Sequence, residues 1–160
     1  MTHDIIDLAA RVGQALQAKQ LILCTAESCT GGGVAQAITE VAGSSAWFDR
    51  GVVTYSNAAK EQMLGVAPAL LAQHGAVSEE VAAAMASGAL VNSGVQVALS
   101  TTGIAGPGGA VPGKPVGTVC FGWAIGNEVH TERLVFGGER GAVREQTVLH
   151  SLQHLLELLA

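Results

Sequence analysis

The residue of this chain best placed to do chemistry is a serine that follows an apolar run. The run begins at Leu21, continues into small and hydroxylated residues that include Ser28, and ends in three glycines at 31–33. Beyond the glycines, apolar residues recur at roughly helical spacing. This order predicts a strand, a sharp turn and a helix. The Ser28 hydroxyl is then expected at the carboxyl end of the strand, where open α/β sheets bind ligands.

Two interpretations of this turn remain open from the spacing alone. Gly31 and Gly32 let backbone N–H groups approach a ligand, and the following helix offers its positive N-terminal end. Ser28 would then be a nucleophile beside an anion site. In the alternative, Ser28 or Thr30 only caps the helix and the glycines only make the turn.

Lys60 is the candidate base for such a serine. It is expected in the first turn of a short helix that starts after Ser56, where the positive helix end disfavours an ammonium group. Burial would lower the pKa of its amine in the same direction, and a neutral amine can activate a serine. The alternative is a lysine that extends into solvent. Tyr55 is expected at the end of the preceding strand. It could be a hydrogen-bonding neighbour of Lys60 or simply a core residue.

Other polar residues offer rival chemistry. Cys29 is a second candidate nucleophile, because a helix N-terminus lowers the pKa of a thiol, although a free cysteine is more often a buried apolar residue. Arg140 and Arg144 begin the last predicted helix. They could bind a phosphate or pair with Glu139, Glu145 and solvent.

The sequence does not match several familiar motifs for nucleotide binding, serine hydrolysis and metal binding. Residues 108–114 resemble a phosphate-binding P-loop, but Pro115 stands where a Ser or Thr must hold magnesium. No G-x-G-x-x-G follows a predicted strand, and G-x-S-x-G is absent around Ser28. His150 and His154 are four residues apart, but the helical pattern places them on the solvent face without a third ligand. We therefore expect neither a metal nor a cofactor.

The elements that must position these residues alternate along the chain. Helices are expected over 4–18, after the glycines at 31–33, after Ser56, at Pro68, over 79–92 and over 139–159. Strands are expected in the apolar run that precedes Ser28 and over 51–55, 95–101, 116–125 and 129–136, and the last two are expected to form a hairpin. This order implies one α/β domain over residues 1–160, with a mixed sheet covered by helices on both faces.

Composition narrows the class of protein. Of the 160 residues, 49% are apolar and only 13% charged, which predicts a large aliphatic core and a homo-oligomer, a dimer or higher. The net charge of −5, with eight scattered Lys and Arg, argues against nucleic acid and anionic membrane as partners. There is no membrane-spanning apolar run and no signal-peptide pattern, and three cysteines fit a reducing compartment. We expect a cytoplasmic protein.

Five segments in order resemble one known family, the CinA C-terminal domain, whose stand-alone members are bacterial nicotinamide-nucleotide amidases. They are TAESCTGG from Thr25, the segment from Gly43 to Asn57, HGAVS from His74, GIAGPGG from Gly103 and KPVGTV from Lys114. The resemblance implies a three-layer α/β/α sandwich with a mixed, mostly parallel five-stranded sheet. It also implies hydrolysis of the carboxamide of nicotinamide mononucleotide, with Ser28 as the nucleophile and Lys60 and Tyr55 as its partners.

From this match we expect a small-molecule nucleotide substrate and no metal. Backbone N–H groups around Gly31 and Gly32, or in the loop from Gly103 to Gly106, would hold the developing oxyanion. Arg140 is the candidate for the substrate phosphate, and Thr30 is expected to line the substrate site. Two alternatives remain: a non-catalytic nucleotide- or partner-binding module linked to competence and damage responses, and a thiol hydrolase that uses Cys29.

Overall fold

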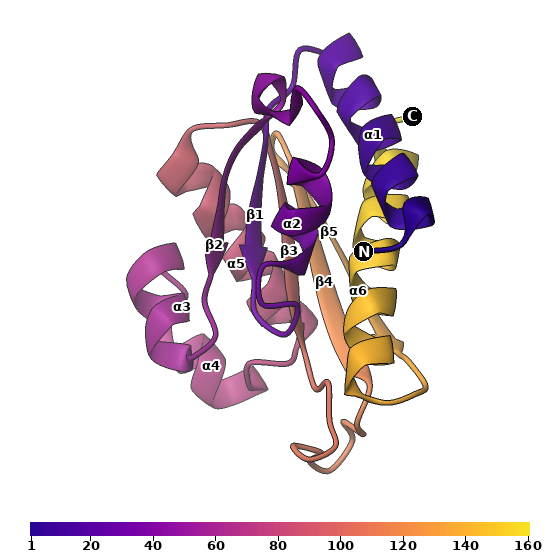
Figure 1. Ribbon diagram of the computed structural model, residues 1–160. Coiled ribbons are helices and arrows are strands. Elements are labelled where there is room, and N and C mark those ends of the chain that lie inside the picture. The colour runs from indigo at the N-terminus through magenta and orange to yellow at the C-terminus, as the bar shows by residue number, and fades with distance from the viewer.

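The computed structural model describes residues 1–160 as one five-stranded sheet between two layers of helices (Figure 1). The strands are β1 (Leu23–Glu27), β2 (Phe48–Val53), β3 (Val97–Gly103), β4 (Thr118–Ile125) and β5 (Glu128–Val135). The helices are α1 (His3–Ala18), α2 (Gly33–Thr39), α3 (Asn57–Leu64), α4 (Pro68–His74), α5 (Glu79–Ser93) and α6 (Arg140–Leu158), with a short 3-10 helix, η1 (Ser44–Ala46). No helix is long and apolar enough to cross a membrane.

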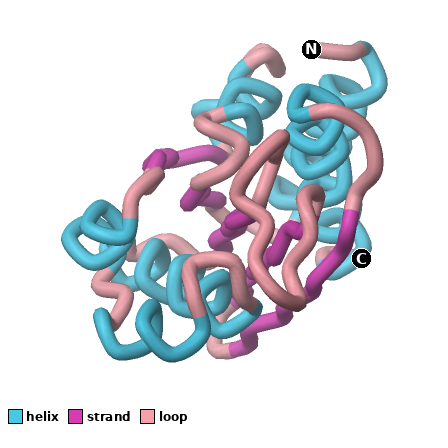
Figure 2. Tube along the Cα trace, turned by 90° about the horizontal axis from the view of Figure 1, so that it is seen from below, coloured by secondary structure: helices cyan, strands magenta, loops and turns pink.

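The strand order β2-β1-β3-β4-β5 brings the chain segments around Ser28 to one edge of the sheet. Strand β1 is parallel to both β2 and β3, whereas β4 is antiparallel to β3 and to β5. Four strands therefore point the same way and β4 alone runs against them. The carboxyl ends of β1, β2 and β3, the start of β4 and the start of α6 all lie at the same edge. Figure 2 looks onto that edge and shows loops filling the space between the helix layers.

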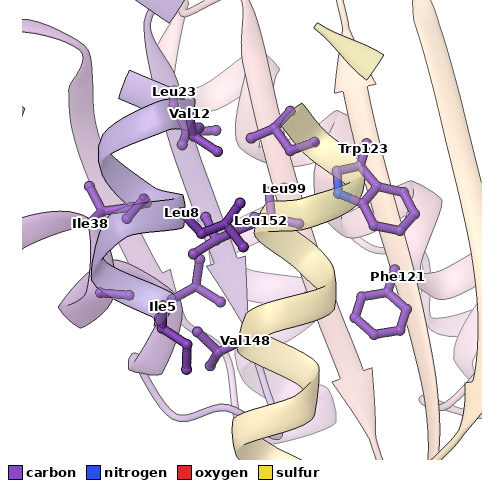
Figure 3. Packing of buried hydrophobic residues seen from close by; sticks show 14 of the residues in the cluster. Ile5, Leu8, Val12, Leu23, Ile38, Leu99, Phe121, Trp123, Val148 and Leu152 are labelled. Atoms are coloured by element: carbon purple, nitrogen blue, oxygen red, sulfur yellow. The ribbon is translucent and has the colours of Figure 1, made fainter. Parts of the chain in front are cut away.

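Alternation along the strands divides the core between the two faces of the sheet. Leu23 and Leu99 point toward α1, α2 and α6, where 22 buried residues form the larger apolar cluster (Figure 3). Cys24 and Ala98 point toward α3, α4 and α5, where the cluster has only 11 buried residues, many of them alanines. The same alternation turns Glu27 toward the α2 layer and its neighbour Ser28 toward the α3 layer.

Small residues let α5 approach its neighbours very closely. A Cβ added at Gly88 would lie 1.9 Å from the carbonyl oxygen of Leu64, the last residue of α3. A Cβ added at Gly122 of β4 would lie 2.5 Å from the carbonyl oxygen of Ala82 in α5. Helix α5 therefore fixes the height of α3 above the sheet, and α3 carries Lys60.

The predicted architecture is confirmed, with differences at the strand ends. Strand β2 begins at Phe48, three residues before its predicted start, and ends at Val53. Tyr55 consequently lies beyond the strand, where its side chain is 62% exposed and is not a core residue. The two hairpin strands and the helix after Ser78 lie where the pattern predicts them, and Ser78 accepts a hydrogen bond from the Val81 amide as an N-cap.

The placement of His150 and His154 on a solvent face holds only in part, since their side chains are 26% and 30% exposed. Their rings stack at 6.0 Å and pack against the aromatic residues of β4, with His150 4.9 Å from the ring of Phe121 and His154 4.4 Å from the ring of Trp123. His150 also contacts the Glu132 carboxylate at 2.6 Å. The hairpin extends the sheet beneath this side of α6, which helical periodicity alone does not reveal. No group of three metal-ligating side chains forms here or elsewhere.

Candidate active site

Ser28 lies one residue beyond β1, where the chain leaves the sheet. Its amide donates to the carbonyl of Thr101 in β3 at 2.9 Å, so the serine continues the strand pairing by one step. The side chain is buried, and its Oγ faces α3. Strand β1 stops at Glu27, and the turn that follows closes with the Gly31 amide donating to the Ser28 carbonyl at 3.0 Å. The Ser28 hydroxyl therefore lies at the edge of the sheet where the carboxyl ends of β1, β2 and β3 meet.

Lys60 reaches Ser28 from α3. The helix starts after Ser56, whose hydroxyl accepts from the Ala59 amide, and Lys60 follows at the end of the first turn. The lysine is only 1% exposed. Its Nζ lies 3.0 Å from Ser28 Oγ and donates to the carbonyl of Thr54 at 2.8 Å. The structure therefore brings the two predicted partners into hydrogen-bonding contact.

Burial lowers the pKa of the Lys60 amine below its usual value, because the charged form loses its hydration. Ionisation of the nearby Cys29 thiol would raise the pKa of Lys60, as the smaller effect. No carboxylate is hydrogen-bonded to Nζ; its two partners are a hydroxyl and a carbonyl. An amine in these surroundings can lose its proton and then accept one from the Ser28 hydroxyl over the same 3.0 Å.

A cavity of about 270 Å3 opens at this pair. Its floor is Ser28 and Lys60, and much of its wall comes from the loop after β3, which includes the predicted glycines Gly103 and Gly106. Thr102 also lines it, with its hydroxyl donating to the carbonyl of Ala76 at 2.8 Å. The remaining lining residues are Cys29, Tyr55, Asn57, Ala76, Val77, Ile104, Ala105, Gly108, Gly109 and Arg140.

Tyr55 and Arg140 form the outer wall of this cavity and contact each other. Arg140 Nη2 donates to the Tyr55 hydroxyl at 3.1 Å, and Nη1 donates to the carbonyl of Gly106 at 2.8 Å. The tyrosine hydroxyl makes no hydrogen bond to Ser28 or Lys60. Tyr55 was expected to orient or relay protons as a partner of Ser28 and Lys60; a relay has no contact in this structure, whereas an orienting contact with Arg140 does.

The positive end of α2 is occupied from within the protein. Its N-cap, Gly32, has no side chain to offer. Instead the buried Glu27 carboxylate accepts from the amides of Val34 at 2.8 Å and Ala35 at 3.0 Å, and from the Thr30 hydroxyl at 2.6 Å. Of the two interpretations of this turn, the one that makes this helix end an anion site beside Ser28 is contradicted, since Glu27 fills it on the opposite face of the sheet.

The residues after Ser28 take structural positions. The Thr30 hydroxyl is turned inward, toward Glu27 and, at 2.8 Å, toward the hydroxyl of Thr101. Gly31 and Gly32 have φ of +59° and +99°, which favours glycine, and neither lines the cavity of Ser28. The Gly31 amide is used by the Ser28 carbonyl, so it is not a free oxyanion donor.

Comparison with known proteins agrees with the sequence motifs. Residues 5–159 match the model of the CinA C-terminal domain. The chain belongs to the CinA C-terminal domain family. It is 53% identical over 154 residues, 96% of each chain, to a nicotinamide-nucleotide amidohydrolase, PncC, of Pseudomonas putida. It is 54% identical over 153 residues, 95% of this chain and 93% of the other, to the protein of the same name in Escherichia coli K12.

Solved structures of this family have the same fold. The competence/damage inducible protein CihA from Agrobacterium tumefaciens superposes with a TM-score of 0.96 at 44% identity, and the match covers 100% of this chain and 98% of that one. A CinA superfamily protein from Klebsiella pneumoniae gives a TM-score of 0.94 at 41% identity, over 97% of each chain. The sheet and both helix layers are thus those of the CinA C-terminal domain family.

Within this CinA-type site, the thiol of Cys29 is a poor nucleophile. It is buried, and burial followed by the nearby Glu27 carboxylate raises its pKa to about 12. The expected lowering by a helix N-terminus fails, because Glu27 already neutralises that end of α2. Cys29 therefore stays protonated at neutral pH, and the thiol alternative loses its chemical basis.

The sequence interpretation missed three sets of contacts around Ser28 and Lys60, although it named Arg144 as a candidate for a phosphate or an ion pair. The carbonyl of Thr54 holds Lys60 Nζ, but a backbone acceptor leaves no mark in the sequence. Arg144 donates from Nε to the carbonyl of Cys29 and from Nη2 to the carbonyl of Thr30, both at 3.2 Å. Glu27 was given no role in the sequence interpretation. Its signal was available, since an isolated acid in an apolar strand beside an uncapped, glycine-led helix must find donors.

Proposed function

We propose that this protein hydrolyses the carboxamide of nicotinamide mononucleotide, giving nicotinate mononucleotide and ammonia within pyridine-nucleotide recycling. The observation that carries the proposal is the 3.0 Å contact between Lys60 Nζ and Ser28 Oγ at the floor of a cavity. A serine paired with an amine of lowered pKa is suited to attack on an amide carbon. The amidohydrolase relatives at 53–54% identity supply the substrate class.

In the first step, Ser28 Oγ attacks the carboxamide carbon while its proton passes to the unprotonated Lys60 amine. The carbonyl oxygen takes the negative charge of the tetrahedral intermediate. When the intermediate collapses, the C–N bond breaks, and the Lys60 ammonium returns its proton to the leaving nitrogen, which departs as ammonia. A nicotinoyl ester on Ser28 remains.

In the second step, water attacks that ester. Lys60, neutral again, accepts a proton from the water, and the tetrahedral intermediate expels Ser28 Oγ, which takes the proton back. The product is the nicotinate carboxylate. Lys60 thus serves as base and then acid in each half-reaction, and the proton that it exchanges with Ser28 moves over the 3.0 Å contact between Nζ and Oγ.

Donors for the oxyanion are available in two places. The amides of Cys29 and Thr30 donate to no other residue, and neither do those of Ala105 and Gly106 in the loop that lines the cavity. Either pair is of the kind that stabilises a tetrahedral oxyanion. We assign the substrate phosphate to Arg140 at the outer wall, with Tyr55 holding the guanidinium in place.

The direct test is ammonia release from nicotinamide mononucleotide by the purified protein, with and without a strong chelator. We expect turnover that the chelator does not change, since the nucleophile and base both come from the chain. If the protein binds the mononucleotide but releases no ammonia across a range of pH, the alternative of a nucleotide-binding module replaces this proposal. Loss of activity with the chelator would contradict the serine–lysine mechanism.

A further inference from the structure

We infer that Glu27 and Arg144 are positioning residues that clamp the turn of Ser28 from two sides and so set the geometry of the nucleophile. The turn in question is residues 28–32. This inference rests on the proposed function, because it assigns roles around the same serine. It goes beyond that function by naming two residues that do not line the Ser28 cavity and yet are expected to control its turnover.

Glu27 holds the inner side of the turn. Its carboxylate is 1% exposed and accepts three hydrogen bonds, from the Thr30 hydroxyl and from the amides of Val34 and Ala35. Glu27 immediately precedes Ser28, and its three donors follow it by three to eight residues. One side chain therefore joins the end of β1 to the start of α2 across the turn. Rotation of the Ser28 backbone would break these charge-assisted bonds to a buried carboxylate.

Arg144 holds the outer side of the turn from α6. Its Nε and Nη2 donate to the carbonyls of Cys29 and Thr30, and Nη2 is 3.4 Å from where a Gly31 Cβ would lie. In a trans peptide the C=O and the following N–H point in opposite directions. Holding the Cys29 carbonyl therefore also turns the Thr30 amide away from Arg144 and leaves it free of protein acceptors.

Arg144 lines a different cavity from the one that contains Ser28 and Lys60. It lines a cavity of about 220 Å3 beside Thr2 and Ile5, which includes neither Ser28 nor Lys60. Its two bonded donors are used by main-chain carbonyls. These contacts favour a positioning role over the substrate-phosphate role, which is the other use of an arginine at the start of α6.

The ratio of kcat to KM effects separates these two roles. Arg144→Lys keeps the charge but cannot reach both carbonyls with one ammonium. For the clamp we expect kcat to fall by about 10-fold in Arg144→Lys and about 100-fold in Arg144→Met, with KM within about 3-fold of wild type. The same losses are expected with nicotinamide riboside, which lacks the phosphate. Arg11→Met, on the exposed face of α1, is the matched control and should match wild type.

Glu27 is tested by Glu27→Gln, with Glu40→Gln at the other end of α2 as the matched control. The glutamine puts an NH2 group where one of the carboxylate oxygens accepts, so we expect kcat to fall by about 100-fold with little change in KM. Amide hydrogen exchange gives a second readout that needs no turnover. Exchange at Val34 and Ala35 should accelerate in Glu27→Gln and stay unchanged in Glu40→Gln.

The outcomes are distinct. If Arg144→Met raises KM for the mononucleotide but leaves kcat and the riboside unaffected, Arg144 binds phosphate and the clamp is wrong. Wild-type kcat together with unchanged amide exchange in Glu27→Gln would equally overturn it. If the wild type releases no ammonia, the proposed function fails instead. The clamp is then judged by amide exchange and by the rate at which a fluorophosphonate labels Ser28, which the clamp predicts to be slower in both variants.

Discussion

Among the single residues, Lys60 gives the most specific prediction, because its proposed role as the base depends on the loss of a proton. We expect Lys60→Met to lower kcat by about 100-fold or more, since the substitution removes the base and leaves the fold intact. In the wild type, kcat/KM should rise with pH through the lowered pKa of Lys60, because only the unprotonated amine accepts the serine proton. A pH series of initial rates tests both statements. Lys19→Met, at the exposed end of α1, is the control.

The contradicting result would be near-normal turnover in a folded Lys60→Met protein. Lys60 would then be a structural lysine. A wild-type rate that stays flat with pH over the range in which Lys60 titrates would exclude it as the base even if the substitution were harmful.

Tyr55 distinguishes a relay from an orienting contact. Its hydroxyl bonds to Arg140 and to neither Ser28 nor Lys60. We therefore expect Tyr55→Phe to raise KM several-fold, as the arginine loses one of its two partners, while kcat changes by less than about 3-fold. Steady-state kinetics decide the matter. A collapse of kcat at unchanged KM would show that the hydroxyl carries a proton after all.

Sequence reasoning predicted the pair of Ser28 and Lys60, which the structure brings into contact, but missed much of what holds the two side chains in place. Ser28 and Lys60 were predicted as a pair, because a serine after a strand and a lysine in the first turn of a helix have recognisable surroundings. The Thr54 carbonyl and the role of Arg144 depend on which segments become neighbours. Glu27 had no predicted role, although strand alternation places it on the opposite face of the sheet from its neighbour Ser28.

The packing of α5 against α3 sets the position of Lys60. Gly88 of α5 meets the carbonyl of Leu64 so closely that any added Cβ must push α3 outward. We expect Gly88→Ala to destabilise the protein by about 1–3 kcal/mol and to lower kcat, because Lys60 moves with α3 away from Ser28. Urea unfolding and steady-state rates measure the two effects.

Gly141 is the matched control for that substitution. It is also a helical glycine, in α6, but a Cβ there would have no atom within 4 Å. Gly141→Ala is expected to leave stability unchanged or to raise it by up to about 1 kcal/mol. Equal stability for both alanine variants would contradict the close α3–α5 contact.

Helices were easier to predict than strand ends. Caps such as Ser56 and Ser78 mark where α3 and α5 begin, and both hydroxyls accept the expected amide hydrogen bonds. Strand β2 was placed too late because Phe48 and Asp49 lack the apolar alternation that marks a strand. It is an edge strand with several exposed positions, so its sequence carries little of the buried pattern.

The molecule as a whole is predicted to self-associate. Only 13% of its residues are charged, and apolar side chains such as Val91 and Leu149 remain exposed at 83% and 40%. Edge strands β2 and β5 also leave backbone groups unpaired on their outer sides. Sedimentation velocity over a range of concentrations should show a dimer or a higher homo-oligomer. A single species at 16.2 kDa at every concentration would contradict this prediction.

The order of elements was enough to predict a mixed sheet between two helix layers, because each short connection and the one hairpin limit where the next element can pack. It was not enough to predict which helix ends remain free for a ligand. The end of α2 is closed by Glu27, and the α6 end, with Arg140, borders the cavity. That distinction depends on side-chain contacts across the sheet.

The central claim is that Ser28, and not its neighbour Cys29, attacks the substrate. Ammonia release from nicotinamide mononucleotide by Ser28→Ala and Cys29→Ala, compared under identical conditions, tests it most directly. With the pKa of Cys29 raised to about 12 and Lys60 Nζ 3.0 Å from Ser28 Oγ, the serine has the base and the thiol has none of the activation it needs. We predict no turnover in a folded Ser28→Ala protein and most of the wild-type rate in Cys29→Ala. An inactive Cys29→Ala beside a working Ser28→Ala would contradict the serine mechanism.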